Sequence, residues 1–111
     1  MNRWNIPLEL ERHVLERDKG CIYCRLDFSQ PAVKRGMRPS WEHIVNDARI
    51  ITPDNIALCC ISCNASKGAK LLEVWLQSKY CFRKGITIES VAEVVRAVLA
   101  KPPSIQSQSA T

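Results

Sequence analysis

The sequence lacks any apolar run long enough to cross a bilayer. A membrane-spanning helix needs roughly 20 consecutive apolar residues, and none occurs in this chain of 111 residues. Glu9, Glu11 and Glu16 interrupt any apolar segment near the N-terminus, so we expect no signal peptide. Internal repeats are absent as well. The lack of a spanning segment and of a signal peptide favours a cytoplasmic protein without a membrane partner, in a reducing compartment where free thiolates persist.

The chain also lacks the length for a large core. Its hydrophobic fraction of 46% supports one small domain with a narrow margin of stability. We expect that domain to cover residues 1–100. Residues 101–111 are rich in proline, serine and glutamine and predict a disordered C-terminal tail. A structural metal or a cross-link would compensate for the small core.

The charge of the chain is only moderately basic. Its formal net charge is +5, which is compatible with a nucleic-acid partner but does not by itself identify one. Lys34, Arg35 and Arg38 lie in a loop predicted for residues 28–39, which contains Pro31, Gly36 and Pro39 as breakers. This loop is either a solvated connection or a finger that contacts phosphate.

Two Cys-x-x-Cys pairs are the strongest chemical signal in the sequence. Cys21 and Cys24 form the first pair, and Cys60 and Cys63 form the second. Each pair can deliver two thiolates from one turn, and two pairs complete the tetrahedral shell of a structural zinc ion. The spacing fits zinc better than a disulfide framework. The alternative is that these are four buried cysteines without a metal.

The two remaining cysteines need separate assignments. Cys59 competes with Cys60 for the metal, but the usual spacing to Cys63 favours Cys60. We therefore expect Cys59 to point into the core of a hairpin. Cys81 is expected to be a free thiol.

Hydrophobic periodicity and turn residues predict several helices and one short hairpin. A face of four valines in the last helix is expected to be core. Gly20 is the predicted stop of the first helix, and Thr87 is the predicted N-cap of the last. The predicted helices cover residues 7–19, from about 62 to 76, and 88–100; the strands cover 40–45 and 56–58; a basic connection covers 80–86.

A carboxylate and an imidazole lie between the two cysteine pairs. Glu42 offers a hard oxygen, and Asn64 offers a carbonyl oxygen, which are ligands that Mg²⁺ or Mn²⁺ prefers. His43 has an ordinary pKa that lets it accept a proton at neutral pH. Neighbouring residues on a strand point to opposite faces, so Glu42 and His43 face one pocket only where the strand bends, bulges or ends. A single histidine on a strand is usually structural.

The order of these motifs resembles the HNH endonuclease family in its four-cysteine zinc form. The resemblance covers roughly residues 7–78 and runs Cys-x-x-Cys, Glu-His-Ile-Val, then Asn-x4-Cys-x-x-Cys-Asn-x-x-Lys-Gly. It implies an α+β fold, a small ββα-metal finger (His-Me finger) with a four-cysteine zinc site and flanking helices. It also implies structural Zn²⁺, catalytic Mg²⁺ or Mn²⁺, and DNA as the substrate.

The resemblance assigns a role to individual residues of this chain. His43 matches the general base that activates water, and Glu42 matches the acidic metal ligand just before it. Asn55 matches the residue that braces the loop and orients the histidine, and Asn64 matches the second metal ligand. Lys67 falls on a basic position that could hold a phosphate. Further candidates for contacts with nucleic acid are Lys70 and Arg38.

The sequence departs from the common family pattern at three positions. Asn64 replaces a histidine, which keeps an oxygen ligand. Glu42 replaces the commoner aspartate and is one methylene longer, and Asn46 stands where a proline is often found. Each needed chemical group is still present. Besides a DNA endonuclease, the sequence allows a zinc-stabilised nucleic-acid-binding module without catalysis, or a zinc-built adaptor for other proteins.

Overall fold

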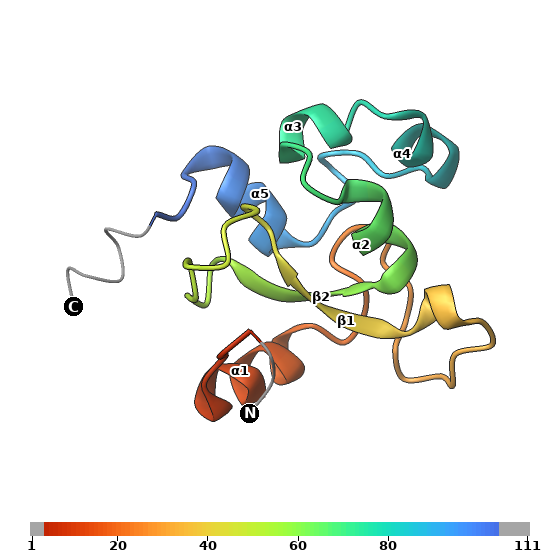
Figure 1. The fold of residues 1–111 in the computed structure, drawn as a ribbon. Coiled ribbons are helices and arrows are strands. Elements are labelled where there is room, and N and C mark those ends of the chain that lie inside the picture. Colours follow the sequence, from red (N-terminus) through yellow and green to blue (C-terminus); the bar gives the residue numbers. More distant parts are fainter. Residues whose placement is uncertain (1–3, 105–111) are drawn as a thin grey trace.

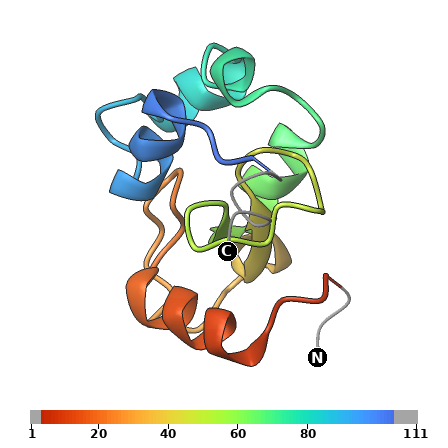
Figure 2. The ribbon, with the colours of Figure 1, turned by 90° about the vertical axis from the view of Figure 1, so that its left-hand side faces the viewer.

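A two-stranded antiparallel sheet lies between helices in the computed structural model, which describes residues 4–104. Strands β1 (Pro39–His43) and β2 (Ile56–Cys60) form the sheet. Helix α1 (Leu8–Arg17) lies on one side of the sheet, and the other helices lie on the opposite side (Figures 1 and 2). The chain is therefore a small mixed α and β structure.

Strand β2 is buried on both faces because helices cover both sides of the sheet. Ile56 and Leu58 belong to a smaller apolar cluster that includes Val14 of α1. Ala57 and Cys59 belong to a larger cluster on the opposite face. This alternation follows from the two-residue period of a strand. The same period decides which face each side chain of β1 occupies.

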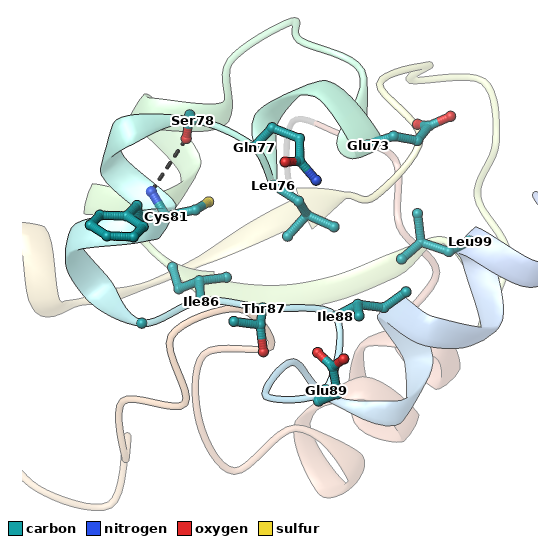
Figure 3. Close-up of a pocket in the computed structure, with 12 residues that line it drawn as sticks. Glu73, Leu76, Gln77, Ser78, Cys81, Ile86, Thr87, Ile88, Glu89 and Leu99 are labelled. Atoms are coloured by element: carbon teal, nitrogen blue, oxygen red, sulfur yellow. Dashed lines mark hydrogen bonds between the residues drawn. The ribbon is translucent and has the colours of Figure 1, made fainter.

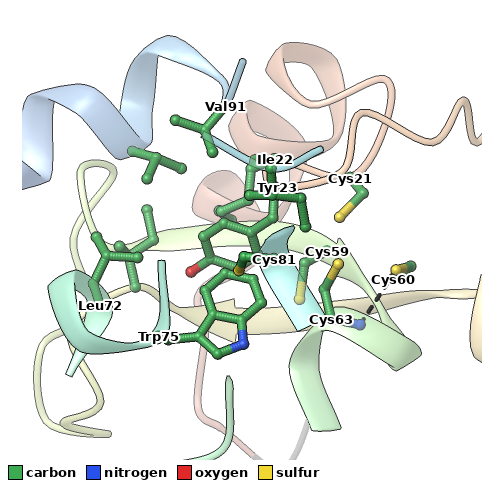
Figure 4. Close-up of a cluster of buried hydrophobic side chains, with 14 of the residues drawn as sticks. Cys21, Ile22, Tyr23, Cys59, Cys60, Cys63, Leu72, Trp75, Cys81 and Val91 are labelled. Atoms are coloured by element: carbon green, nitrogen blue, oxygen red, sulfur yellow. Dashed lines mark hydrogen bonds between the residues drawn. The ribbon is translucent and has the colours of Figure 1, made fainter. Parts of the chain in front are cut away.

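The larger cluster joins segments that lie far apart in the sequence. The rings of Tyr23 and Trp75 meet edge to face, with 4.8 Å between their centroids (Figure 4). Leu72 and Trp75 come from helix α3 (Leu72–Trp75), and buried Val95 and Val98 come from helix α5 (Glu93–Ala100). The buried positions of Val91, Val95 and Val98 confirm the prediction of an apolar valine face.

The helix predicted from about residue 62 to 76 is wrong, because two shorter helices stand in its place. Helix α2 (Ile61–Lys67) ends at Gly68, whose φ of 51° interrupts the helical path. Glycine tolerates this backbone at little cost. Because the chain changes direction at Gly68, α2 packs against the sheet, whereas Leu72 and Trp75 of α3 pack in the larger cluster.

The basic connection predicted over residues 80–86 contains helix α4 (Lys79–Lys84). The Ser78 side chain accepts a hydrogen bond from the backbone N–H of Cys81 and caps this helix. Gly85 ends it with a φ of 70°. The serine cap and the terminal glycine are helix signals, but this segment was predicted to be a connection because of its basic residues.

The last helix begins later than predicted. Thr87 and Ser90 hydrogen-bond to each other in a turn, and α5 begins only at Glu93. The first helix ends at Arg17 rather than near Gly20, and a short 3-10 helix, η1 (Arg35–Met37), lies within the predicted loop. Side-chain bonds that compete with the helix explain the late start of α5.

Strand β1 ends at His43 rather than at residue 45, while β2 extends to Cys60. Residues 101–104 of the expected tail are described, with Pro103 buried, and residues 105–111 lie outside the described residues. Among the helices of residues 4–104, none is long and apolar enough to cross a membrane.

Candidate metal centre

The four predicted cysteines meet at one point. The sulfur atoms of Cys21, Cys24, Cys60 and Cys63 all lie within 4.8 Å of one another. The Cys24 and Cys60 sulfurs are 3.8 Å apart. A tetrahedral zinc ion with Zn–S bonds of about 2.3 Å requires sulfur separations of roughly 3.8 Å. The cluster can therefore hold a zinc ion, and within residues 4–104 it is the one group of three or more Cys, His, Asp or Glu side chains placed to do so.

Two tight turns aim the thiols at this point. The backbone N–H of Cys24 lies 3.5 Å from the Cys21 sulfur. The backbone N–H of Cys63 lies 3.4 Å from the Cys60 sulfur (Figure 4). Cys60 also caps the N-terminus of α2 with its side chain. The second pair thus joins the end of β2 to the start of α2, so a bound ion would tie the sheet and this helix to the first turn.

The four thiols perturb one another strongly. Hydrogen bonding with Cys21 is the main cause that lowers the pKa values of Cys24 and Cys60, the latter to about 7. The pKa of Cys21 is raised, chiefly by its hydrogen bond with Cys24, and that of Cys63 chiefly by its hydrogen bond with Cys21. Four thiols this close share protons unless a cation replaces them. A metal ion would favour the thiolate form of all four.

The other two cysteines lie outside the cluster, as predicted. Cys59 is fully buried in the larger apolar core, where burial raises its pKa. Cys81 is a buried thiol of α4. The hydroxyl of Tyr80 lies 3.3 Å from the Cys63 sulfur and 2.9 Å from the hydroxyl of Ser62, beside the cluster.

Glu42 lies on the face of β1 that meets α2, and two side chains, those of Lys67 and Tyr23, end on one of its carboxylate oxygens. The ammonium of Lys67 is 3.1 Å from Oε2, and the hydroxyl of Tyr23 donates to the same oxygen at 2.5 Å. Burial raises the pKa of Glu42, while Lys67 and Tyr23 oppose that shift. Lys67 also reaches the carbonyl oxygen of His43 at 3.4 Å.

Lys67 does not lie on the surface, where a residue expected to hold a phosphate would be accessible. Only 1% of the residue is exposed, because α2 packs against β1 and directs the side chain to Glu42. A buried lysine needs a paired carboxylate to remain charged. Its place in this structure is therefore an internal ion pair rather than an exposed contact for phosphate.

Asn64 bridges α2 and β1. Its side-chain nitrogen donates to the hydroxyl of Ser40 and to the carbonyl of Trp41, both at 3.0 Å. No hydrogen bond to its Oδ1 atom forms within residues 4–104. Asn64 thus joins α2 to the strand that carries Glu42, and the two residues offer one amide oxygen and one carboxylate as hard donors.

The imidazole of His43 lies on the opposite face of β1. It meets the ring of Trp4 edge to face at 5.1 Å, and its paired residue Ile56 belongs to the smaller cluster. Its Nε2 atom is buried and has no hydrogen-bond partner within the described chain. Burial, with the charge of Lys67, lowers the pKa of His43, while Asp47 raises it. Burial therefore favours the neutral form of the imidazole.

The structure does not gather all of the predicted site residues around one cavity. It pairs Glu42 with Lys67, bonds Asn64 to Ser40 and Trp41 of the same strand, and places the ring of His43 on the other side of that strand. Comparisons of this chain with protein-family models, curated proteins and solved structures found no match. What the chain does must follow from the chemistry of these side chains.

Asn55 braces the loop that follows His43. Its Oδ1 accepts the N–H of Val45 at 2.7 Å, and its Nδ2 donates to the carbonyls of Val45 and Ile50 at 3.2 and 3.1 Å. The backbone oxygen of Asn55 accepts the N–H of Ile44 at 3.0 Å. The side chain is fully buried. These bonds hold the end of β1 in place.

Tyr23 is the site residue that sequence reasoning missed. It lies between Cys21 and Cys24 and binds Glu42, which is far away in the sequence. A tyrosine inside a metal-binding turn was the available signal, since a buried tyrosine hydroxyl needs a partner. The identity of that partner is visible only in the fold.

A cavity of about 730 Å³ lies away from these residues, between α3, α4, the segment 85–89 and Leu99 of α5 (Figure 3). Its lining includes Leu76, Ile86 and the buried thiol of Cys81. None of the four clustered cysteines and none of Glu42, His43 or Asn64 lines it.

Proposed function

We propose that this protein is a divalent-metal-dependent DNA endonuclease of the HNH type, built on a ββα-metal finger. The observation that carries the proposal is the unpaired Nε2 of His43. Buried polar atoms are nearly always hydrogen-bonded, and exceptions gather at functional sites. An imidazole whose Nε2 atom has no partner suits a general base that awaits a water molecule, and the residue before it in the sequence is the buried Glu42.

The donor set between β1 and α2 fits Mg²⁺ or Mn²⁺. Glu42 would supply a carboxylate oxygen and Asn64 its amide oxygen, and hard cations prefer oxygen ligands of this kind. The side-chain nitrogen of Asn64 is occupied by β1, which leaves its oxygen for the ion. Such an ion would stabilise the negative charge that develops on a phosphodiester during cleavage.

The opposite orientations of His43 and Glu42 are compatible with one substrate if DNA binds along the free edge of β1. The sheet has two strands, so β1 has one edge without a partner strand. A phosphate beside that edge, where the strand ends at His43, would lie between the two faces. His43 would then take a proton from the attacking water, and Asn55 would hold the histidine by fixing the loop after it.

A second candidate is a zinc-stabilised nucleic-acid-binding module without catalysis. The observation that favours it is the pairing of Glu42 with Lys67 and Tyr23 on the same oxygen. A carboxylate that is already satisfied by a lysine has less need of a metal. The two candidate functions predict different effects on DNA cleavage when the Glu42 carboxylate is removed.

Replacing Glu42 with glutamine should end cleavage if the protein is a nuclease. The amide keeps the size of the side chain but removes the charge that would hold the metal, and we expect a loss of at least about a hundredfold in rate. The cleavage rate is measured as nicking of supercoiled plasmid with added Mg²⁺ or Mn²⁺. In a binding module, DNA affinity would be unchanged and no cleavage would be seen in either protein.

The change leaves Lys67 buried without its partner, which can destabilise the fold by about 3–5 kcal/mol. The double variant Glu42→Gln/Lys67→Gln has no unpaired buried charge and serves as the matched protein. Zinc content and DNA affinity show whether each variant is folded. A folded Glu42 variant that cleaves at the rate of the natural protein would exclude a catalytic metal at this residue.

Basic residues from separate segments converge beside the cysteine cluster. Lys34 and Lys84 line a common cavity of about 390 Å³ together with Cys24 and Cys60. Arg38 is exposed nearby, just before β1, and neither it nor the two lysines forms an ion pair within residues 4–104. We propose that these cations contact the DNA backbone. Lys70 is also exposed, with its ammonium on the carbonyl of Ser66 at 3.0 Å, whereas Lys67 is buried.

The double variant Lys34→Gln/Arg38→Gln should reduce the salt dependence of DNA binding. Each lost phosphate contact lowers the slope of log K against log salt by about 0.9, so we expect a decrease of nearly 2. Fluorescence anisotropy over a series of salt concentrations, without added divalent metal, measures the slope. The variant Lys19→Gln/Lys101→Gln removes the same charge elsewhere on the exposed surface. Equal slopes for the two variants would contradict a localised contact.

A further inference from the structure

The carboxylate of Glu42 is anchored by a tyrosine that belongs to the first cysteine turn. Tyr23 is fully buried, and its ring packs edge to face against Trp75 at 4.8 Å. Its hydroxyl donates to Oε2 of Glu42 at 2.5 Å. Cys21 and Cys24, on either side of it, belong to the four-thiol cluster. A single hydrogen bond therefore connects the candidate zinc site with the candidate catalytic site.

We propose that Tyr23 is a positioning residue that orients Glu42 for the divalent cation and couples the zinc turn to it. This inference rests on the proposed function, because it assumes that a cation binds at Glu42 and Asn64. Tyr23 touches neither substrate nor metal in this role. It acts only through the carboxylate.

The geometry explains why the hydroxyl would matter. Both the Tyr23 hydroxyl and the Lys67 ammonium end on Oε2, so that atom is fixed from two sides. The rotation of the carboxylate is then restricted, and neither of these two side chains ends on Oε1, which would meet the ion. Carboxylates that bind metals are usually held by such outer hydrogen bonds, and losing one typically costs 10- to 100-fold in metal affinity.

A bound zinc ion would further restrict the position of the Tyr23 hydroxyl. Tyr23 lies in a turn whose two ends are cysteines of the cluster, so a bound ion would restrict the backbone of that turn. The larger core fixes the ring itself through Trp75. With both supports, the hydroxyl stays at a defined distance from the strand that carries Glu42.

The test is the affinity of zinc-loaded protein for Mn²⁺, measured directly by electron paramagnetic resonance of the unbound ion. Tyr23→Phe removes only the hydroxyl and keeps the ring that contacts Trp75, so the fold and the zinc content should persist. We expect its Mn²⁺ affinity to fall by 10- to 100-fold. The matched control is Tyr80→Phe, which removes a hydroxyl beside Cys63 but none beside Glu42. That control should bind Mn²⁺ like the natural protein.

The possible results separate this inference from the proposed function. If the natural protein binds Mn²⁺ and Tyr23→Phe binds it within about twofold, the positioning role is overturned while the nuclease proposal stands. An equal loss in both tyrosine variants would also overturn it, because the effect would then be general to the zinc site. A natural protein that binds no Mn²⁺ would remove the catalytic metal site, and the role of Tyr23 with it.

Discussion

Alanine in place of His43 should abolish DNA cleavage while zinc content and DNA affinity remain unchanged. The imidazole is the proposed base, and loss of a general base typically lowers the rate by about 10²- to 10⁴-fold. Plasmid cleavage with a series of divalent metals, run on both proteins, measures the effect. The acid limb of the pH–rate profile of the natural protein should lie below 6.5, the ordinary pKa of histidine, because burial lowers the pKa of His43.

His13 provides the matched control for this prediction. It is the other histidine of the chain, and its side chain is exposed on α1. His13→Ala should cleave at the natural rate. An undiminished rate in His43→Ala would rule out the assignment of the base. Loss of DNA binding in the same variant would instead point to a structural role for the histidine, since its ring packs against Trp4.

Replacing Cys60 with alanine should unfold the protein, whereas the same change at the adjacent Cys59 should not. Structural zinc sites contribute about 10–16 kcal/mol of binding free energy in small domains, which exceeds the stability of most such chains. Losing one of four thiolates opens the site. At Cys59 the change removes one buried sulfur atom from the apolar core, and we expect a cost of about 1–2 kcal/mol.

Zinc per chain and the urea dependence of unfolding measure both variants. Cys59→Ala should retain one zinc ion per chain, and Cys60→Ala should retain none. A strong chelator should unfold the natural protein, and added zinc should restore it. If instead Cys60→Ala keeps its zinc and its stability, the sulfur cluster does not bind the ion that holds the fold together.

The four cysteines that could hold a zinc ion could be predicted because their geometry is local. A Cys-x-x-Cys turn brings two sulfurs together whatever the rest of the chain does, and the same spacing separated Cys60 from Cys59. The hairpin was predictable for a similar reason, since β-prone residues flank a loop. Helix boundaries were less accurate. Gly68 and the hydrogen bonds between Thr87 and Ser90 act on single turns and disturb the apolar period only slightly.

The partners of Glu42 could not be predicted in the same way. Tyr23 comes from a turn before the sheet, and Lys67 comes from the end of the helix after it. Nothing in the spacing of these residues relates them to one another. Lys67 was expected to be accessible to a phosphate, and this prediction is wrong, because lysine side chains are mostly exposed but this one has a buried partner.

Residue types and their spacing thus determined by themselves the four thiols, the hard oxygen donors and a histidine beside a carboxylate. The tertiary structure decided which of these side chains meet. The two-residue period of β1 sends Glu42 toward α2 and His43 toward the N-terminal segment, and packing of helices on both faces then supplies a different set of neighbours to each. Local periodicity sets the direction of a side chain, whereas its partners come from distant segments that only the folded chain brings together.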